Sequence, residues 1–97
     1  MSEAKDPEEF YKKLKAQLHD TDMWPTIYLY KFIVPTNELK IEAIHDIFDN
    51  MGAVIKTKQS RNGKYTSVSV NVKMRDPDAV IAKYKEVGIK IEGVISL

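Results

Sequence analysis

Hydrophobic and polar positions recur with two different periods along the chain, and each period predicts one kind of element. A spacing near four predicts three helices, over residues 6–19, 36–52 and 76–88. Alternation with β-branched and aromatic residues predicts four strands, over residues 26–34, 53–60, 64–74 and 89–97. The order is therefore one helix followed by β-α-β-β-α-β.

Residues suited to helix ends support these boundaries. The expected N-caps are Asp6, Thr36 or Asn37, and Asp76. Gly52 suits the left-handed position after the second helix, and Gly88 is expected to close the third. The stretches around these glycines, FDNMGAVI and YKEVGIKI, share an aromatic, an apolar residue, glycine and isoleucine at matching positions. This likeness predicts two similar corners between helix and strand.

The order of elements predicts an α+β sandwich of the ferredoxin-like βαββαβ type. Two right-handed crossovers would pack the last two helices on one face of an antiparallel sheet. The expected strand order is 4-1-3-2, which leaves the other face of the sheet open. We divide the chain into an N-terminal helix and linker, residues 1–24, and a ferredoxin-like domain, residues 25–97.

Alternation within the strands assigns side chains to the two faces. On the third strand the expected open-face residues are Tyr65, Ser67, Ser69, Asn71 and Lys73. On the second strand they are Lys56 and Lys58. On the last strand, residues 90, 92, 94 and 96 are expected on the open face, and the inward side chains are expected to be Ile89, Ile91, Ile95 and Leu97.

The first strand is apolar on both faces. A buried unpaired lysine is costly, so we expect Lys31 to face outward. Its outward neighbours are then Ile27, Leu29 and Ile33, and its inward ones Tyr28, Tyr30, Phe32 and Val34. An apolar stripe of this length is expected to be covered by another part of the protein or by a partner. We expect the cover to be a second copy of the protein or the N-terminal helix, through Phe10, Leu14 and Leu18.

Composition and charge narrow the function classes. The chain has no cysteine, which excludes disulfides and thiolate chemistry. It shows no signal-peptide pattern and no apolar run of membrane-spanning length, so we expect a cytoplasmic protein with no membrane partner. The net charge of +1 favours no partner. Between Gly52 and Arg75, however, every charged residue is a cation: Lys56, Lys58, Arg61, Lys64, Lys73 and Arg75.

No catalytic, cofactor or metal site is predicted. His45 and Asp49 could share a helix face, but a zinc site needs three or four ligands. Ser67 and Ser69 have no histidine placed near them to act as a base. No glycine-rich phosphate loop is present. We therefore expect a protein that is not an enzyme.

Nucleic-acid binding is disfavoured but stays an alternative. RNA-recognition sheets stack bases on aromatic side chains on the open face of the two central strands, and here Tyr65 is the only aromatic residue expected on that face. The basic hairpin could still hold a phosphate backbone without reading sequence. Lysines on an edge strand have a second explanation, because they block aggregation between sheets.

One stretch carries a family resemblance. SRNGKYTSVSVNV at residues 60–72, with YKF at 30–32 and YKEVG at 84–88, resembles the bacterial YbeD family of proteins of unknown function. The resemblance covers residues 24–97. It implies a fold akin to ACT regulatory domains and a role in binding a small ligand or in regulation. ACT domains that bind amino acids use a glycine-containing loop after the first strand, but the loop at residues 34–40 has no glycine. Asn37 could adopt a left-handed conformation there.

The sequence thus predicts a non-enzymatic, ACT-like binding or regulatory domain without cofactor. Its partner is expected to be a protein, a small anionic ligand, or a second copy in a homodimer. The predicted ligand surface consists of Lys56, Lys58, Arg61, Lys64, Tyr65, Ser67, Ser69, Asn71 and Lys73.

Overall fold

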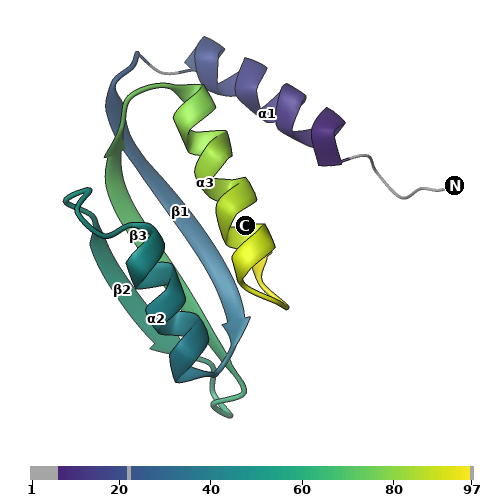
Figure 1. The fold of residues 1–97 in the computed structure, drawn as a ribbon, viewed down its shortest axis with the longest axis vertical. Coiled ribbons are helices and arrows are strands. Elements are labelled where there is room, and N and C mark those ends of the chain that lie inside the picture. Colours follow the sequence, from purple (N-terminus) through teal and green to yellow (C-terminus); the bar gives the residue numbers. More distant parts are fainter. Residues whose placement is uncertain (1–6, 22, 97) are drawn as a thin grey trace, which may run out of the picture.

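The computed structural model describes residues 7–21 and 23–96, and it arranges them around one four-stranded sheet (Figure 1). The elements are α1 (Pro7–Thr21), β1 (Thr26–Pro35), α2 (Glu38–Ile47), β2 (Val54–Gln59), β3 (Tyr65–Met74), α3 (Pro77–Lys90) and β4 (Ile95–Ser96). The strands pair antiparallel in the order β2-β3-β1-β4. Figure 1 shows α2 and α3 crossing the same side of the sheet. The predicted α+β ferredoxin-like class and strand order are confirmed.

Side-chain caps start α2 and α3 at the expected places. The Asn37 side-chain oxygen accepts hydrogen bonds from the backbone N–H groups of Leu39 and Lys40, at 2.8 and 3.2 Å. The Asp76 carboxylate accepts one from the N–H of Ala79 at 2.8 Å. These bonds satisfy amides that have no partner inside the first helical turn. The expected cap of α1, Asp6, lies outside the described residues.

The end of α3 differs from the prediction. Gly88 does not close the helix, which continues to Lys90. Ile91 then caps it with a hydrogen bond from its N–H to the carbonyl of Val87, at 2.9 Å. Val87 and Ile91 are both buried, so the helical spacing of core residues extends past the glycine and outweighs its weak helix propensity. α2 also ends earlier than expected, at Ile47, so Gly52 does not close it. Positive backbone angles fall at Asn50 and Gly52 in the first corner and at Gly93 in the second, so the two corners are not alike.

The longer helix changes the last strand. Ile89 was expected inward but lies on α3 with 83% of its surface exposed. β4 is shortened to two residues, and Ile95 pairs with Ile33 on the open face instead of facing the core. Val94, expected on the open face, packs in part against the core. The prediction for Leu97 lies outside the described residues.

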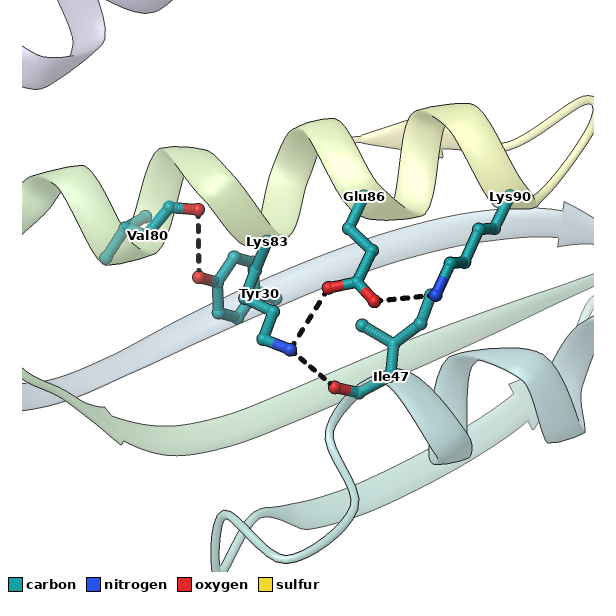
Figure 2. Close-up of polar contacts among 6 residues, drawn as sticks. All are labelled: Tyr30, Ile47, Val80, Lys83, Glu86 and Lys90. Carbon is teal, nitrogen blue, oxygen red and sulfur yellow. Dashed lines mark hydrogen bonds and ion pairs between the residues drawn. The ribbon is translucent and has the colours of Figure 1, made fainter.

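Tyr30 lies at the centre of the core. Its side chain is fully buried, and its ring lies 4.8–5.7 Å from those of Tyr28, Phe32, Phe48 and Tyr84. The hydroxyl donates a hydrogen bond to the carbonyl of Val80 in α3, at 3.0 Å (Figure 2). Burial raises the pKa of this phenol, and the neighbouring phenols raise it further. The hydroxyl therefore stays a neutral donor that ties β1 to α3.

A lysine joins the two helices on the covered side. Lys83 donates from its ammonium to the carbonyl of Ile47, at 2.7 Å, and to the carboxylate of Glu86, at 3.1 Å (Figure 2). Glu86 also accepts from Lys90 at 2.9 Å, and that bond is the main reason why its pKa is lowered. The last turn of α2 leaves carbonyl groups without partners inside the helix. Lys83 satisfies one of them and so fixes α2 against α3.

The N-terminal helix does not cover the open face. α1 lies beside α3 on the helix side of the sheet (Figure 1), with Leu18 buried in the core. Lys15 pairs with Asp78 at 2.7 Å, and Lys85 with Glu8 at 3.3 Å. Phe10 is largely exposed and Leu14 half-buried. The expectation that α1 packs on Ile27, Leu29 and Ile33 is therefore wrong.

We expect Tyr30→Phe to lower the free energy of unfolding by about 1 kcal/mol, because the ring still fits but the buried hydrogen bond is lost. Urea denaturation measures the change. Tyr65→Phe is the matched control, since Tyr65 is half-exposed on the other face of the sheet, and it should stay within about 0.5 kcal/mol of the wild type. Equal effects of the two changes would contradict the role given to the Tyr30 hydroxyl.

The Asp76 cap predicts a dependence of stability on pH. Hydrogen bonds from the Ala79 amide, and next from Arg75, lower the pKa of Asp76 below its ordinary value of 3.8. The stabilisation is thus present above pH 3.8 and is lost as the pH falls through the lowered value. Thermal unfolding should show Asp76→Asn less stable than the wild type at neutral pH, with the difference shrinking under acid.

Glu42→Gln is the control for this experiment, because Glu42 is an exposed carboxylate on α2. It should keep the pH dependence of the wild type. A difference between Asp76→Asn and the wild type that is the same at acid and neutral pH would contradict the assignment.

Candidate functional site

The open face of the sheet is built from alternate residues of all four strands. The register places Lys56 opposite Ser69 and Ser69 opposite Lys31, all on the side away from α2 and α3. The next row is Lys58, Ser67, Ile33 and Ile95. The whole face comprises Ile27, Leu29, Lys31, Ile33 and Pro35 on β1, Tyr65, Ser67, Ser69, Asn71 and Lys73 on β3, Val54, Lys56 and Lys58 on β2, and Ile95 on β4.

Three neighbouring strands give this face three lanes of different chemistry, with Lys31 lying between Leu29 and Ile33 on β1 and the exposed Val54 at one end of β2. The apolar lane on β1 contains Ile27 and Leu29, whose surfaces are 69% and 53% exposed, and the half-buried Ile33. The serine lane on β3 consists of the small polar residues Ser67, Ser69 and Asn71. The lysine lane on β2 consists of Lys56 and Lys58. The predicted outward positions of β1, β2 and β3 are confirmed.

The charge of the face is entirely positive. Its lysines are Lys31, Lys56, Lys58 and Lys73, and no aspartate or glutamate belongs to it. None of these lysines forms a salt bridge with another described residue, whereas Lys15, Lys83, Lys85 and Lys90 all do. Exposed apolar side chains and uncompensated cations thus lie side by side without a cover in the described part of the chain.

A hollow of about 570 Å³ marks the hairpin end of the face. It brings together four residues of the predicted ligand surface, Lys58, Arg61, Tyr65 and Ser67. Its other walls are Ile33, Gln59 and Ser60, which the sequence did not assign to the ligand surface. Lys56, Ser69, Asn71 and Lys73 lie further along the face, and Lys64 lies in the turn. The hollow therefore combines two cations, a phenol and an aliphatic wall.

The turn beside the hollow is ordered by its own side chains. The Ser60 hydroxyl accepts a hydrogen bond from the N–H of Tyr65 at 3.1 Å, and the Asn62 side chain accepts one from the N–H of Lys64 at 3.0 Å. Gly63 takes the positive backbone angle that closes the turn. Ser60 thus positions Tyr65, a role that the turn pattern alone did not indicate.

The loop at residues 34–40 corresponds to the loop that binds amino acids in ACT domains, but here its backbone amides are capped by a side chain. Asn37 has an extended backbone, so the left-handed conformation considered for it is wrong. Its side chain accepts hydrogen bonds from the amides of Leu39 and Lys40, which would otherwise face a ligand. The comparison with amino-acid-sensing ACT domains is therefore weakened at this loop.

A metal site and a membrane-spanning helix have little support in the described part of the chain. His45 and Asp49 line a second hollow of about 370 Å³, but no three metal-ligating side chains gather among residues 7–21 and 23–96. Ser67 donates its hydroxyl to the Lys58 carbonyl at 3.3 Å. No described helix has the length and apolar character needed to cross a membrane.

The edge position of β2 predicts a protective role for its lysines. We expect Lys56→Thr/Lys58→Thr to aggregate at lower protein concentration than the wild type, since an uncharged edge strand pairs readily with another chain. Light scattering measures this. Lys12→Thr/Lys13→Thr removes two exposed lysines from α1 and should not change the aggregation threshold. Equal aggregation of both variants would point to net charge instead of the edge.

Comparison with known families places this architecture without assigning an activity. Residues 22–95 match the family described as "Protein of unknown function (DUF493)". This match is compatible with the resemblance to the YbeD family. No curated protein and no solved structure matches the chain. Since the matched segment includes β1, β2, β3, α2 and α3 and reaches the first residue of β4, the chain belongs to the DUF493 family.

Proposed function

We propose that this chain is a non-enzymatic, ACT-like binding or regulatory domain that takes an anionic ligand on the open face of its sheet. The ligand is a small molecule or an acidic segment of a protein. The observation that carries this proposal is the uncovered face itself, where Lys31, Lys56, Lys58 and Lys73 lie beside exposed isoleucine and leucine with no acid among them.

The energetics favour a ligand that satisfies both parts of the face. Burial of apolar surface contributes about 25 cal/mol for each Å² removed from water. An exposed ion pair adds about 0.2–1 kcal/mol, and more when the partner also excludes water. A ligand with both negative charge and apolar surface therefore gains from the lysines and from the apolar lane at once.

Binding of a nucleic-acid backbone is the second candidate, because the same lysines and Arg61 could contact phosphates. The face argues against nucleic-acid binding in two respects. Tyr65 is its one aromatic residue, so bases would find no stacking platform there. The apolar lane would also have no partner in a phosphate chain.

The test uses two polyanions and one pair of matched variants. Poly-L-glutamate at low ionic strength should shift backbone amide signals of β1, β2 and β3 in NMR spectra of the full chain. Lys31→Gln/Lys58→Gln should weaken this binding about two- to thirtyfold, since two contacts of about 0.2–1 kcal/mol each are lost. Lys56 remains to protect the edge in this variant.

Lys12→Gln/Lys13→Gln carries the same loss of charge on α1 and should bind poly-L-glutamate like the wild type. Equal weakening by both variants, or shifts on another surface, would overturn the proposal. A random single-stranded RNA serves as the second polyanion. If the wild type binds it more tightly than poly-L-glutamate at equal salt, the nucleic-acid candidate replaces the first.

A further inference from the structure

The dimensions of the open face single out one kind of ligand. We infer that its occupant is an amphipathic acidic α-helix of another protein, lying along the serine lane with leucine-like residues on the apolar lane and carboxylates over the lysine lane. This inference rests on the proposed function and deepens it, because it chooses a helix over a small molecule.

The length of the apolar lane points to a helix instead of a small ligand. Ile27 pairs with Lys73 near one end of β3, and Ile33 pairs with Ser67 toward the other. Six residues of strand separate them, which is about 20 Å. A helix of about 13 residues has this length. A small molecule seated in the hollow at Tyr65 would leave Ile27 and Leu29 exposed.

The width of the face agrees with the same occupant. The apolar lane on β1 and the lysine lane on β2 are two strand spacings apart, or about 10 Å. A helix with its side chains has a diameter of about 10–12 Å. The lane between them consists of Ser67, Ser69 and Asn71, whose short side chains leave room for a convex surface. Longer side chains stand on both flanks.

The order of the lanes specifies the pattern of the helix. On one flank Lys31 interrupts the apolar residues, between Leu29 and Ile33. Lys56 and Lys58 lie on the other flank, with Lys56 across from Lys31. A helix lying over the serine lane would meet these with an apolar stripe next to an acidic stripe, at spacings of three and four residues. Tyr65 and Arg61, at the hollow, would receive one end of it.

The charges disfavour a second copy of the chain as the occupant. A two-fold dimer through this face would bring the lysines of both copies into one interface that contains no acid. Like charges brought together in this way cost binding energy. The α1 helix of another copy is no better, because its Glu8, Glu9 and Asp20 are offset by Lys12, Lys13 and Lys15, so it brings no net negative charge. The occupant must therefore bring its own acidic residues.

Two synthetic peptides test the helix. Each has about 14 residues, long enough for the apolar lane. The first has leucine at positions spaced three and four apart and glutamate on the adjoining stripe, and the second has the same composition in an order that gives no common face. Fluorescence anisotropy with the full chain should show the first peptide binding at least about tenfold more tightly, because only it can meet both lanes at once.

Single substitutions test whether the peptide binds to the open face. Leu29→Ser should weaken the binding of the amphipathic peptide by about tenfold, and Ile27→Ser should also weaken it. Both changes should leave poly-L-glutamate binding as in the wild type, since they remove no charge. Leu39→Ser is the control, because Leu39 is 76% exposed on α2 and far from the face. NMR spectra of each variant confirm that the fold is intact.

The outcomes separate the inference from the proposed function. If neither poly-L-glutamate nor the amphipathic peptide binds, both fail. Two results would overturn only the inference of a helical ligand. One is that poly-L-glutamate binds but the two peptides bind equally tightly. The other is that Leu29→Ser and Leu39→Ser change peptide binding to the same extent. A wild-type dimer that Leu29→Ser abolishes would overturn it in favour of a second copy, and displacement of the peptide by random RNA would do so in favour of nucleic acid.

Discussion

The burial of the Tyr30 ring among the aromatic side chains of the core is the constraint on which the rest of the structure depends. Its hydroxyl finds a partner in the Val80 carbonyl, so Tyr30 faces α3 with no polar group left unsatisfied. Because side chains alternate along a strand, this one orientation turns Leu29 and Lys31 to the other side. Pairing with β3 and β2 then fixes every residue of the open face. The candidate site is in this sense a consequence of the packing of the opposite face.

All three helices lie on one side of the sheet, and that distribution leaves the other side available for binding. Lys83 joins α2 to α3, while salt bridges and Leu18 hold α1 against α3. On the helix side, carboxylates of the same chain pair with Lys15, Lys83, Lys85 and Lys90. No lysine of the open face pairs with a carboxylate of the described residues. The asymmetry between the two sides supports a partner that supplies negative charge.

The sequence could predict the faces of β1, β2 and β3, because strict alternation and a lysine between apolar residues leave one sensible orientation. It could not predict the end of α3, since the helical spacing of Val87 and Ile91 competes with Gly88 and the balance depends on the packed core. That error led to the wrong placement of Ile89 and Ile95. The hollow was predicted in part: Lys58, Arg61, Tyr65 and Ser67 were identified, and Ile33 was placed on the same face, where it lies opposite Ser67. Gln59 and Ser60 join them only through the shape of the turn.

The alternation of β1 and β3 also bears on how this surface can diverge. The core of these strands uses residues such as Tyr30, Phe32, Val68 and Val70, and the open face uses the residues between them. Residues of the two sets share a backbone but no side-chain environment. A related chain could therefore exchange its whole exposed set, and with it the identity of its partner, while keeping the same folded sandwich. The same separation makes the sheet a suitable scaffold for engineering new binding surfaces.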